Sequence, residues 1–331
     1  MINKKKVLIG YNFILHYRVP LFNILSKRYD LTVLHSGKSI RRSSDLYNEI
    51  IVPVYKISRI YFQPGLIKEI NAKKYDVVIL LFDVAWITSL FAALYFRNRQ
   101  RLILWGAWLT KNSLANKFRL LFSKAAVANI FYTYRSSDDF RKLGLNEDKI
   151  FVANNTFDVG NTLDSSECAI KNTLIFVGSL DLRKENHVLI NAFCNILPLI
   201  DKNINLHIIG TGSQYDTLVR LVDELNISSR VIFKGKIEDQ KLLELEYKHA
   251  IASISFGQAG LSVLQSLGFG VPFITKKNAI SGGEIYNLKH NHNGLLCEDM
   301  SDLESKLLLM CTDKVFAKSL GAHAYNYYHQ Y

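Results

Sequence analysis

The stretch that decides the fold is residues 173–210, which read TLIFVGSLDLRKENHVLINAFCNILPLIDKNINLHIIG. Apolar runs at 173–177 and 205–210 predict two buried strands, and the amphipathic segment 184–199 between them predicts a helix. Two strands joined through a helix lie parallel in one sheet, with the helix against a face of that sheet. Because the same alternation continues to the C-terminus, we expect a parallel sheet covered by helices in this half of the chain.

The N-terminal half shows the same alternation of apolar strands and helices. Its predicted strands are residues 6–10, 31–35, 50–53, 77–82, 102–105, 130–133 and 150–153. A polar stretch, residues 154–172, separates the two series, and 331 residues exceed what a single core usually holds. We therefore predict an α/β protein of two Rossmann-like parallel-sheet domains facing across a cleft. Their expected bounds are 1–160 and 161–331, and the last helix could pack back on the first domain.

The composition is typical of a folded protein with reduced thiols. Hydrophobic residues make up 49% of the chain and charged residues 21%, which excludes a disordered protein. The four cysteines are far apart and form no Cys-x-x-Cys pair, a usage typical of the cytosol and unlike a structural zinc site. The N-terminus lacks the long apolar segment of a secretory signal. We therefore expect a cytoplasmic protein.

The positive charge of the chain lies in its first half. Residues 1–164 contain 25 Lys and Arg against 12 Asp and Glu, whereas residues 165–331 contain 16 against 17. A basic domain favours an anionic partner. No zinc-finger spacing, RNP-like motif or basic zipper accompanies the charges, so we expect no binding of nucleic acid. An acidic membrane surface or a phosphorylated substrate is the preferred partner, and a solvated basic surface without a partner is the alternative.

One apolar segment, residues 77–96, is long enough to raise the question of a membrane span. Asp83 lies near its middle, and a charge at the centre of a bilayer costs at least ~2.5 kcal/mol. The preferred interpretation is a buried strand at 77–82, a turn, and a helix at 84–96 packed on the sheet.

Candidate site residues follow the predicted strands of the second half, where parallel α/β sheets bind their ligands. Arg183 and Lys184 follow the strand at 173–177 and could clamp a diphosphate, although two solvated charges would look the same. Gly210-Thr211-Gly212 ends the next strand and alone is a weak signal.

Gly260 precedes a predicted helix that opens at Leu261 or Ser262, so an anion could approach the free N–H groups of the first turn. From the residues alone, an ordinary strand–helix–strand unit explains this segment equally well.

Taken together, residues 173–298 resemble the C-terminal, donor-binding domain of glycosyltransferase family 4. The resemblance is carried by VGSL at 177–180, Lys184, LINAF at 189–193, IGTG at 209–212, VIFKGKI at 231–237, GLSVLQ at 260–265, GVP at 270–272, SGGE at 281–284 and NGLL at 293–296. It implies the two-domain GT-B fold and a nucleotide-diphosphate sugar as co-substrate. It also implies retention of the anomeric configuration, with no metal or other cofactor required.

The same resemblance implies a set of site residues in the second domain. Those that would bind the donor are Gly178, Ser179, Gly210, Gly212, Ile237, Gln258, Gly260, Leu261, Ser262, Gln265 and Glu284. Arg183 and Lys184 would neutralise the leaving diphosphate. The family signature has two glutamates eight positions apart, where this chain has Gly257 and Gln265. Gln265 can still bind a ribose hydroxyl, whereas a neighbour must supply the sugar contact that Gly257 lacks.

The first domain, residues 6–155, resembles the family less strongly. His16 and Arg18 follow the first strand and are similar to an acceptor-side loop, with a structural histidine as the alternative for His16. Asp83 could act as a base or bind a sugar hydroxyl, or it could only cap a helix. Trp105 and Trp108 could stack on a sugar ring, or they could belong to the core.

The sequence thus predicts a retaining, metal-independent glycosyltransferase. It would move a sugar to a hydroxyl of a lipid-linked, lipopolysaccharide or capsule glycan. It would work at the cytoplasmic face of the bacterial inner membrane, held there by the basic N-terminal domain. A sugar-nucleotide 2-epimerase-like enzyme and a non-catalytic partner of another glycosyltransferase are the alternatives.

Overall fold

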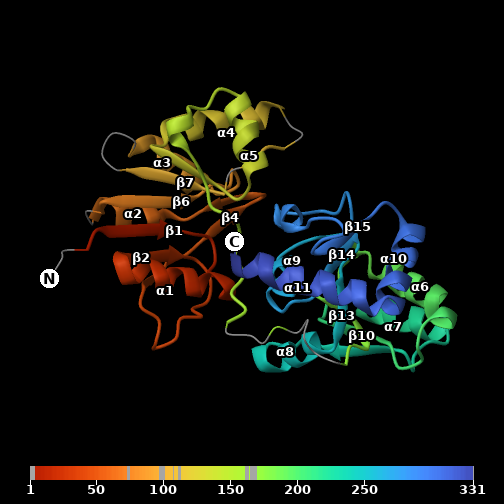
Figure 1. Ribbon diagram of the computed structural model, residues 1–331. Coiled ribbons are helices and arrows are strands. Elements are labelled where there is room, and N and C mark those ends of the chain that lie inside the picture. The colour runs from red at the N-terminus through yellow and green to blue at the C-terminus, as the bar shows by residue number, and fades with distance from the viewer. Residues whose placement is uncertain are drawn as a thin grey trace. The chain divides into compact units, whose positions relative to one another are not determined.

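The computed structural model describes residues 4–72, 75–96, 101–106, 108–110, 113–160, 164 and 170–330. The chain forms two compact units, Met1–Asn155 and Thr156–Tyr331 (Figure 1). The boundary lies inside the polar stretch at 154–172, slightly before the expected position after residue 160. Cys168 and most of residues 161–169 lie outside the described residues.

The first unit contains a parallel sheet in the order β3-β2-β1-β6-β7-β8-β9. Its strands are β1 (Lys6–Gly10), β2 (Asp30–His35), β3 (Asn48–Ile51), β6 (Val77–Leu81), β7 (Leu102–Trp105), β8 (Ala128–Phe131) and β9 (Ile150–Val152). Its helices are α1 (Val19–Arg28), α2 (Pro64–Ala72), α3 (Ile87–Tyr95), α4 (Ser113–Ala125) and α5 (Tyr134–Lys142). Every strand predicted for this half is present, because buried strands of a parallel sheet are largely continuous apolar runs, although the edge strands β3 and β9 are only partly buried.

A small antiparallel hairpin, β4 (Tyr55–Ile57) and β5 (Ile60–Phe62), was not predicted. Its residues are mostly exposed, so no alternation of apolar and polar side chains marks it. The interpretation of residues 77–96 is confirmed, since β6 ends at Leu81 and α3 begins at Ile87. Of the helices within the described residues, none has the length and apolar character to cross a membrane.

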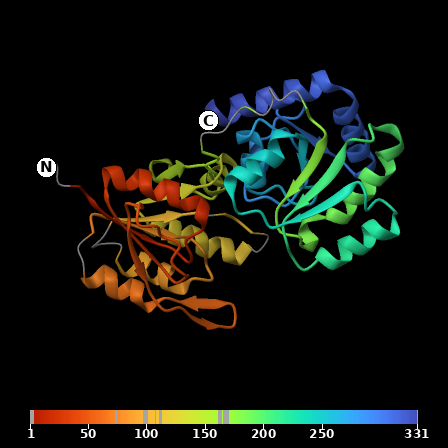
Figure 2. The same cartoon turned by 90° about the horizontal axis from the view of Figure 1, so that it is seen from below.

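The second unit contains a parallel sheet in the order β12-β11-β10-β13-β14-β15. Its strands are β10 (Thr173–Val177), β11 (Asn205–Ile209), β12 (Val231–Gly235), β13 (Ala250–Ile254), β14 (Phe273–Lys276) and β15 (Gly294–Cys297). Its helices are α6 (Asn186–Ile196), α7 (Tyr215–Glu224), α8 (Gln240–Lys248), α9 (Ser262–Gly268), α10 (Met300–Thr312) and α11 (Lys314–Gln330). They cover both faces of the sheet (Figure 2).

The strand order of the second sheet reverses between β10 and β13. Successive strands extend to one side of β10 and then, from β13 onward, to the other side. At such a switch point the loops after the two central strands diverge, which leaves room for a ligand beyond their carboxyl ends. The two-unit, parallel-sheet architecture that the sequence predicts is confirmed.

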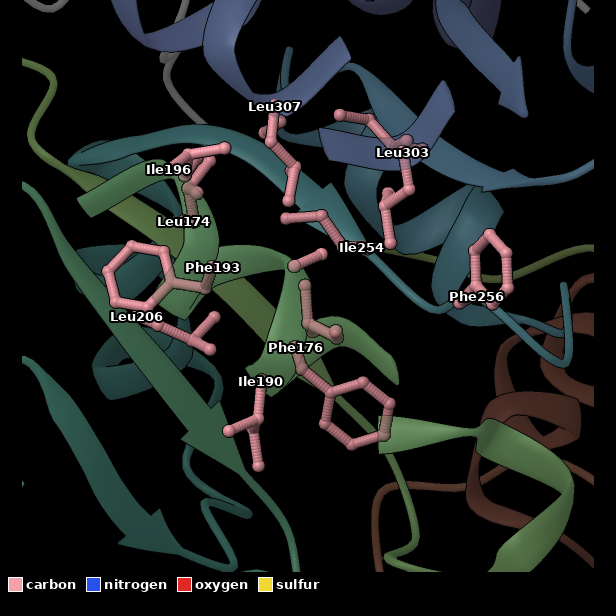
Figure 3. Packing of buried hydrophobic residues seen from close by; sticks show 14 of the residues in the cluster. Leu174, Phe176, Ile190, Phe193, Ile196, Leu206, Ile254, Phe256, Leu303 and Leu307 are labelled. Carbon is pink, nitrogen blue, oxygen red and sulfur yellow. The ribbon is translucent and has the colours of Figure 1, made fainter. Parts of the chain in front are cut away.

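Apolar side chains from the sheet and two helices hold this switch point rigid. Phe176 of β10 and Ile254 of β13 are fully buried and pack with Phe193 of α6 and Leu303 of α10 (Figure 3). On the opposite side of the sheet, α11 lies along α9 (Figure 1). The Tyr328 hydroxyl at the end of α11 donates a hydrogen bond to the carbonyl of Phe157. The last helix is therefore an integral part of the second unit.

Candidate functional site

Three loops meet beyond the carboxyl ends of β10, β13 and β14, at the switch point. The backbone N–H of Gly257, in the loop after β13, donates to the Lys184 carbonyl at 3.0 Å. The N–H of Ile280, in the loop after β14, donates to the Gly257 carbonyl at 2.9 Å. The structure therefore brings together the segments that carry Lys184, Gln258, Gly260 and Glu284.

Lys184 is a largely buried cation that makes no direct ion pair with a carboxylate of the described residues. Its exposed fraction is 8%, and within the described residues its ammonium makes no ion pair or hydrogen bond. Burial lowers the pKa of Lys184 below its usual value, and the attraction of Asp181 and Glu284 does not offset this effect. Leaving a charge buried and unpaired is unfavourable for folding. Groups whose pKa is perturbed in this way cluster at functional sites.

The Lys184 side chain lies beside Gly178. A Cβ at Gly178 would lie 3.6 Å from Lys184 Cε and 3.7 Å from its Nζ, and the backbone φ of Gly178 is +156°. The lysine side chain thus lies back along the turn that follows β10.

Unlike Lys184, Arg183 is exposed and forms an ion pair. Its side chain is 63% exposed, and its guanidinium pairs with Asp181 at 3.1 Å, which lowers the pKa of that carboxyl. Ser179 donates to the same carboxylate at 2.8 Å. The helix was expected to begin at Lys184, but this detail is wrong. Arg183 and Lys184 occupy a 3-10 turn, and α6 begins only at Asn186, because Glu185 has a left-handed backbone with φ 55°.

The glycines after β11 serve first to pack two turns together. A Cβ at Gly210, where φ is +143°, would lie 1.8 Å from the Gly178 carbonyl oxygen. A Cβ at Gly212 would lie 2.3 Å from the carbonyl oxygen of Leu180. Only glycine permits this contact between the two turns, and the part of both glycines in donor binding stays a prediction.

The loop before α9 has open space and unsatisfied polar atoms. A Cβ at Gly260 would meet nothing within 4 Å. Gln258 Oε1 and Ser262 Oγ are buried and make no hydrogen bond to any residue that the structure describes. Leu261 caps α9 without a side-chain hydrogen bond. Because buried polar atoms normally have partners, this loop is a candidate for binding a polar ligand.

The remaining predicted donor residues are buried or partly buried. Gln265 in α9 is 9% exposed, and the Tyr247 hydroxyl donates to its Oε1 at 3.4 Å. Glu284 is 5% exposed and accepts a hydrogen bond from Ser281 at 3.2 Å. Ile237, after β12, packs against the cluster around Tyr247.

In the first unit, Arg18 and Trp105 are part of the core. Arg18 is 3% exposed, its guanidinium lies 4.8 Å from the Trp105 ring, and it donates to Asn155 Oδ1 at 2.8 Å and to the Tyr132 hydroxyl at 3.2 Å. Trp105 is 6% exposed. Contacts within the unit thus hold the Arg18 guanidinium, and the expected contact of these two residues with an acceptor stays a prediction.

The other first-unit candidates lie nearer the surface. His16 is exposed in the 3-10 turn His16–Arg18. Asp83 accepts a hydrogen bond from the Ala85 N–H at 2.9 Å and so shapes the turn before α3, but it does not cap that helix, whose N-cap is Trp86. Trp108 is 44% exposed. The roles of these three residues toward an acceptor stay predictions.

Sequence reasoning overlooked two charged residues of the site, Glu185 and Lys276. Lys276 ends β14, and its ammonium pairs with the Glu185 carboxylate. Lys184 and Glu185 are adjacent in sequence, but nothing local indicates that Lys276, 91 positions further on, is their neighbour.

Comparisons with known proteins agree with this geometry. Residues 165–327 match the family "Glycosyl transferases group 1". An N-acetyl-alpha-D-glucosaminyl L-malate synthase of Bacillus anthracis is 27% identical over 154 residues, which cover 46% of this chain and 39% of that protein. An alpha-1,4-N-acetyl-D-galactosaminyltransferase of Campylobacter jejuni, named for a glycan on PP-undecaprenol, is 31% identical over 157 residues, covering 46% and 42%. The matches thus span about two fifths of these relatives' lengths.

The whole chain is also similar in fold to a solved structure. Anabaena HepE in complex with UDP superposes with a TM-score of 0.75 at 17% identity, covering 98% of this chain and 95% of that one. Residues 165–327 therefore belong to the group 1 glycosyl transferases, in a chain that has the GT-B fold.

Proposed function

We propose that this protein is a glycosyltransferase that uses a nucleotide-diphosphate sugar. The observation that carries the proposal is Lys184, a buried and unpaired ammonium at the switch point of a group 1 domain. A diphosphate there would supply the counter-ion that the fold does not. The structure of Anabaena HepE was solved with UDP, which supports a nucleoside diphosphate as the ligand.

In the proposed reaction, the bond between the anomeric carbon and the diphosphate oxygen breaks, and the electron pair stays on the diphosphate. The acceptor hydroxyl oxygen bonds to the anomeric carbon on the same face, so configuration is retained, and the hydroxyl proton passes to the departing phosphate. Lys184 stabilises the charge that develops on the leaving group, as positioned cations do in other phosphate-releasing reactions. We propose that no metal is needed for this step.

The acceptor that we propose is a lipid-linked glycan. The Campylobacter relative is named for a glycan on undecaprenyl diphosphate, an acceptor that lies at a membrane. A protein that serves such an acceptor benefits from binding the membrane surface itself.

One face of the first unit is suited to that surface. Ile87, Phe91 and Tyr95 are exposed at intervals of four on α3, and α4 exposes Leu114, Phe118 and Leu121 at intervals of four and three. The two helices contact one another (Figure 1). The exposed α4 residues Lys117 and Lys124 add positive charge. Apolar side chains flanked by lysines are the features of a helix that lies in an acidic bilayer interface.

The test of the enzyme proposal is a thermal-shift screen against UDP-, GDP-, dTDP- and CMP-sugars, followed by transfer assays. A ligand that binds only the native protein raises its Tm. We expect one nucleotide-diphosphate sugar to raise the Tm and to give labelled glycolipid with bacterial membrane extracts, also in EDTA. Isomerisation of the donor without an acceptor would favour the epimerase, and the absence of any sugar-nucleotide binding would favour a non-catalytic partner.

The membrane proposal is tested by sedimentation with liposomes of phosphatidylglycerol or phosphatidylcholine. We expect binding to the acidic liposomes that salt weakens and that Phe118→Asp abolishes. Leu242→Asp is the matched control, because Leu242 is similarly exposed, at 55%, on α8 of the other unit. Equal binding of the two variants would reject the α3–α4 face.

A further inference from the structure

The backbone of Glu185 is held in a conformation that disfavours its own side chain. With φ 55° and ψ 40°, it is left-handed at the junction of a 3-10 turn and α6. Glycine adopts this conformation freely, whereas a residue with a Cβ adopts it at a cost. Strained residues of this kind cluster at active sites and ligand clamps, where the surrounding structure holds them in place.

The Glu185 side chain lies beside Gly257, in the space that a residue with a Cβ would need. A Cβ at Gly257 would lie 2.7 Å from Glu185 Cγ and 2.9 Å from its Cδ, and 2.3 Å from the Arg183 carbonyl oxygen. Glycine at 257 and glutamate at 185 are thus complementary. The Glu185 carboxyl group thus lies where a side chain at position 257 would lie.

The Glu185 carboxylate is paired through only one of its two oxygen atoms. One oxygen, Oε1, pairs with Lys276 at 2.5 Å, and the Lys276 ammonium also lies 5.6 Å from the centre of the Phe256 ring. The other oxygen, Oε2, accepts no hydrogen bond from the residues that the structure describes. The two side chains are 29% and 26% exposed, so a ligand can reach them.

The charges and hydrogen-bonding groups of Glu185 and Lys276 indicate which part of a nucleotide sugar they would contact, the diphosphate or the sugar. A carboxylate next to Lys184 repels a diphosphate, so it cannot face the phosphates. Sugar hydroxyls are donors that suit a carboxylate acceptor, and an ammonium beside it can donate to a hydroxyl oxygen. From these contacts we infer that Glu185, held by Lys276, binds the hydroxyls of the donor sugar. The inference depends on the proposed function, since it assigns a residue to the sugar of that donor.

The experiment compares wild type with Glu185→Gln, Glu185→Gly and the control Glu224→Gln, which alters an exposed glutamate at the end of α7. The probes are the nucleotide sugar with the largest shift in the screen and its free nucleoside diphosphate. Calorimetry gives both Kd values, transfer kinetics give kcat/KM, and thermal denaturation gives the Tm.

We expect both Glu185 variants to bind the free nucleoside diphosphate as wild type does, within about twofold. Binding of the nucleotide sugar should weaken by about tenfold or more, with a larger loss in kcat/KM, because a charged hydrogen-bond acceptor is removed. Glu185→Gly should keep or raise the Tm, since glycine relieves the backbone strain. Glu224→Gln should behave as wild type.

Two outcomes separate the two proposals. If wild type transfers sugar and Glu185→Gln transfers it equally well, the assignment of Glu185 is wrong and the proposed function stands. If wild type binds no nucleotide sugar at all, the proposed function is wrong and the assignment of Glu185 falls with it. Equal weakening of both probes would likewise overturn the assignment, because that result places Glu185 at the diphosphate.

Discussion

Replacing Lys184 by methionine separates what the buried ammonium does for folding from what it does for binding. Methionine has a similar length and no charge, so its side chain can lie beside Gly178 as that of Lys184 does. A hydrogen bond to a charged group contributes about 1.5–3 kcal/mol, and every 1.4 kcal/mol is about tenfold in Kd. Lys184→Met should therefore weaken binding of a nucleoside diphosphate by about 10- to 150-fold.

The effect of the same change on stability has the opposite sign. The pKa of Lys184 is lowered in the folded protein, so the charged form is less favourable there than in the unfolded chain. Removing the charge should raise the free energy of unfolding at neutral pH, where each 1 kcal/mol shifts Tm by about 2–4 °C in a domain of this size. The advantage should shrink as the pH rises through the lowered pKa toward 10.5, since wild type then loses the buried charge.

The assay combines thermal denaturation from pH 7 to pH 10.5 with calorimetric titration of UDP and GDP. We expect a variant as stable as wild type or more stable, and a binding isotherm that is strongly weakened. A variant that melts far below wild type and still binds the diphosphate normally would refute the reasoning. That result would make Lys184 a structural residue.

Three further predictions follow from the same contacts. Gly210→Ala should lower the free energy of unfolding, measured by urea denaturation, by about 2–4 kcal/mol, because its Cβ would collide with the Gly178 carbonyl. Gly260→Ala should change the same free energy by less than about 0.5 kcal/mol. Arg18→Met should lower the free energy of unfolding by about 2–4 kcal/mol through lost hydrogen bonds and ring contacts. An unchanged free energy of unfolding together with a raised KM for the acceptor would indicate instead that Arg18 binds the acceptor. Donor binding measured by calorimetry should weaken as the pH rises past the lowered pKa of Lys184, and Lys184→Arg should remove this dependence because arginine stays charged.

The architecture could be predicted from the sequence because each strand and helix is marked by the pattern of its own residues. Strands such as β10 and β13 are buried on both faces, and this burial leaves continuous apolar runs between amphipathic helices. The hairpin β4–β5 was missed because its strands have no buried face. The start of α6 was misplaced because a left-handed glutamate has no sequence signature, and only a glycine or asparagine would have suggested it.

The site was predicted only in part because its contacts join distant segments. Lys184 and Gly260 follow strands directly, and the rule for parallel sheets places such residues at the binding edge. Arg18 could not be assigned, since the Tyr132 and Asn155 groups that hold it come from the far end of the unit. Glu185 was overlooked for the same reason, because its side chain lies beside Gly257, which is distant in sequence.

The most direct test of the account is a crystal structure of the protein with a bound nucleotide-diphosphate sugar. We predict that a phosphate oxygen lies within hydrogen-bonding distance of the Lys184 ammonium and that the backbone at Gly260 faces the diphosphate. A nucleotide bound in the first unit, or one whose phosphates contact Arg183 while Lys184 stays buried apart from them, would contradict it.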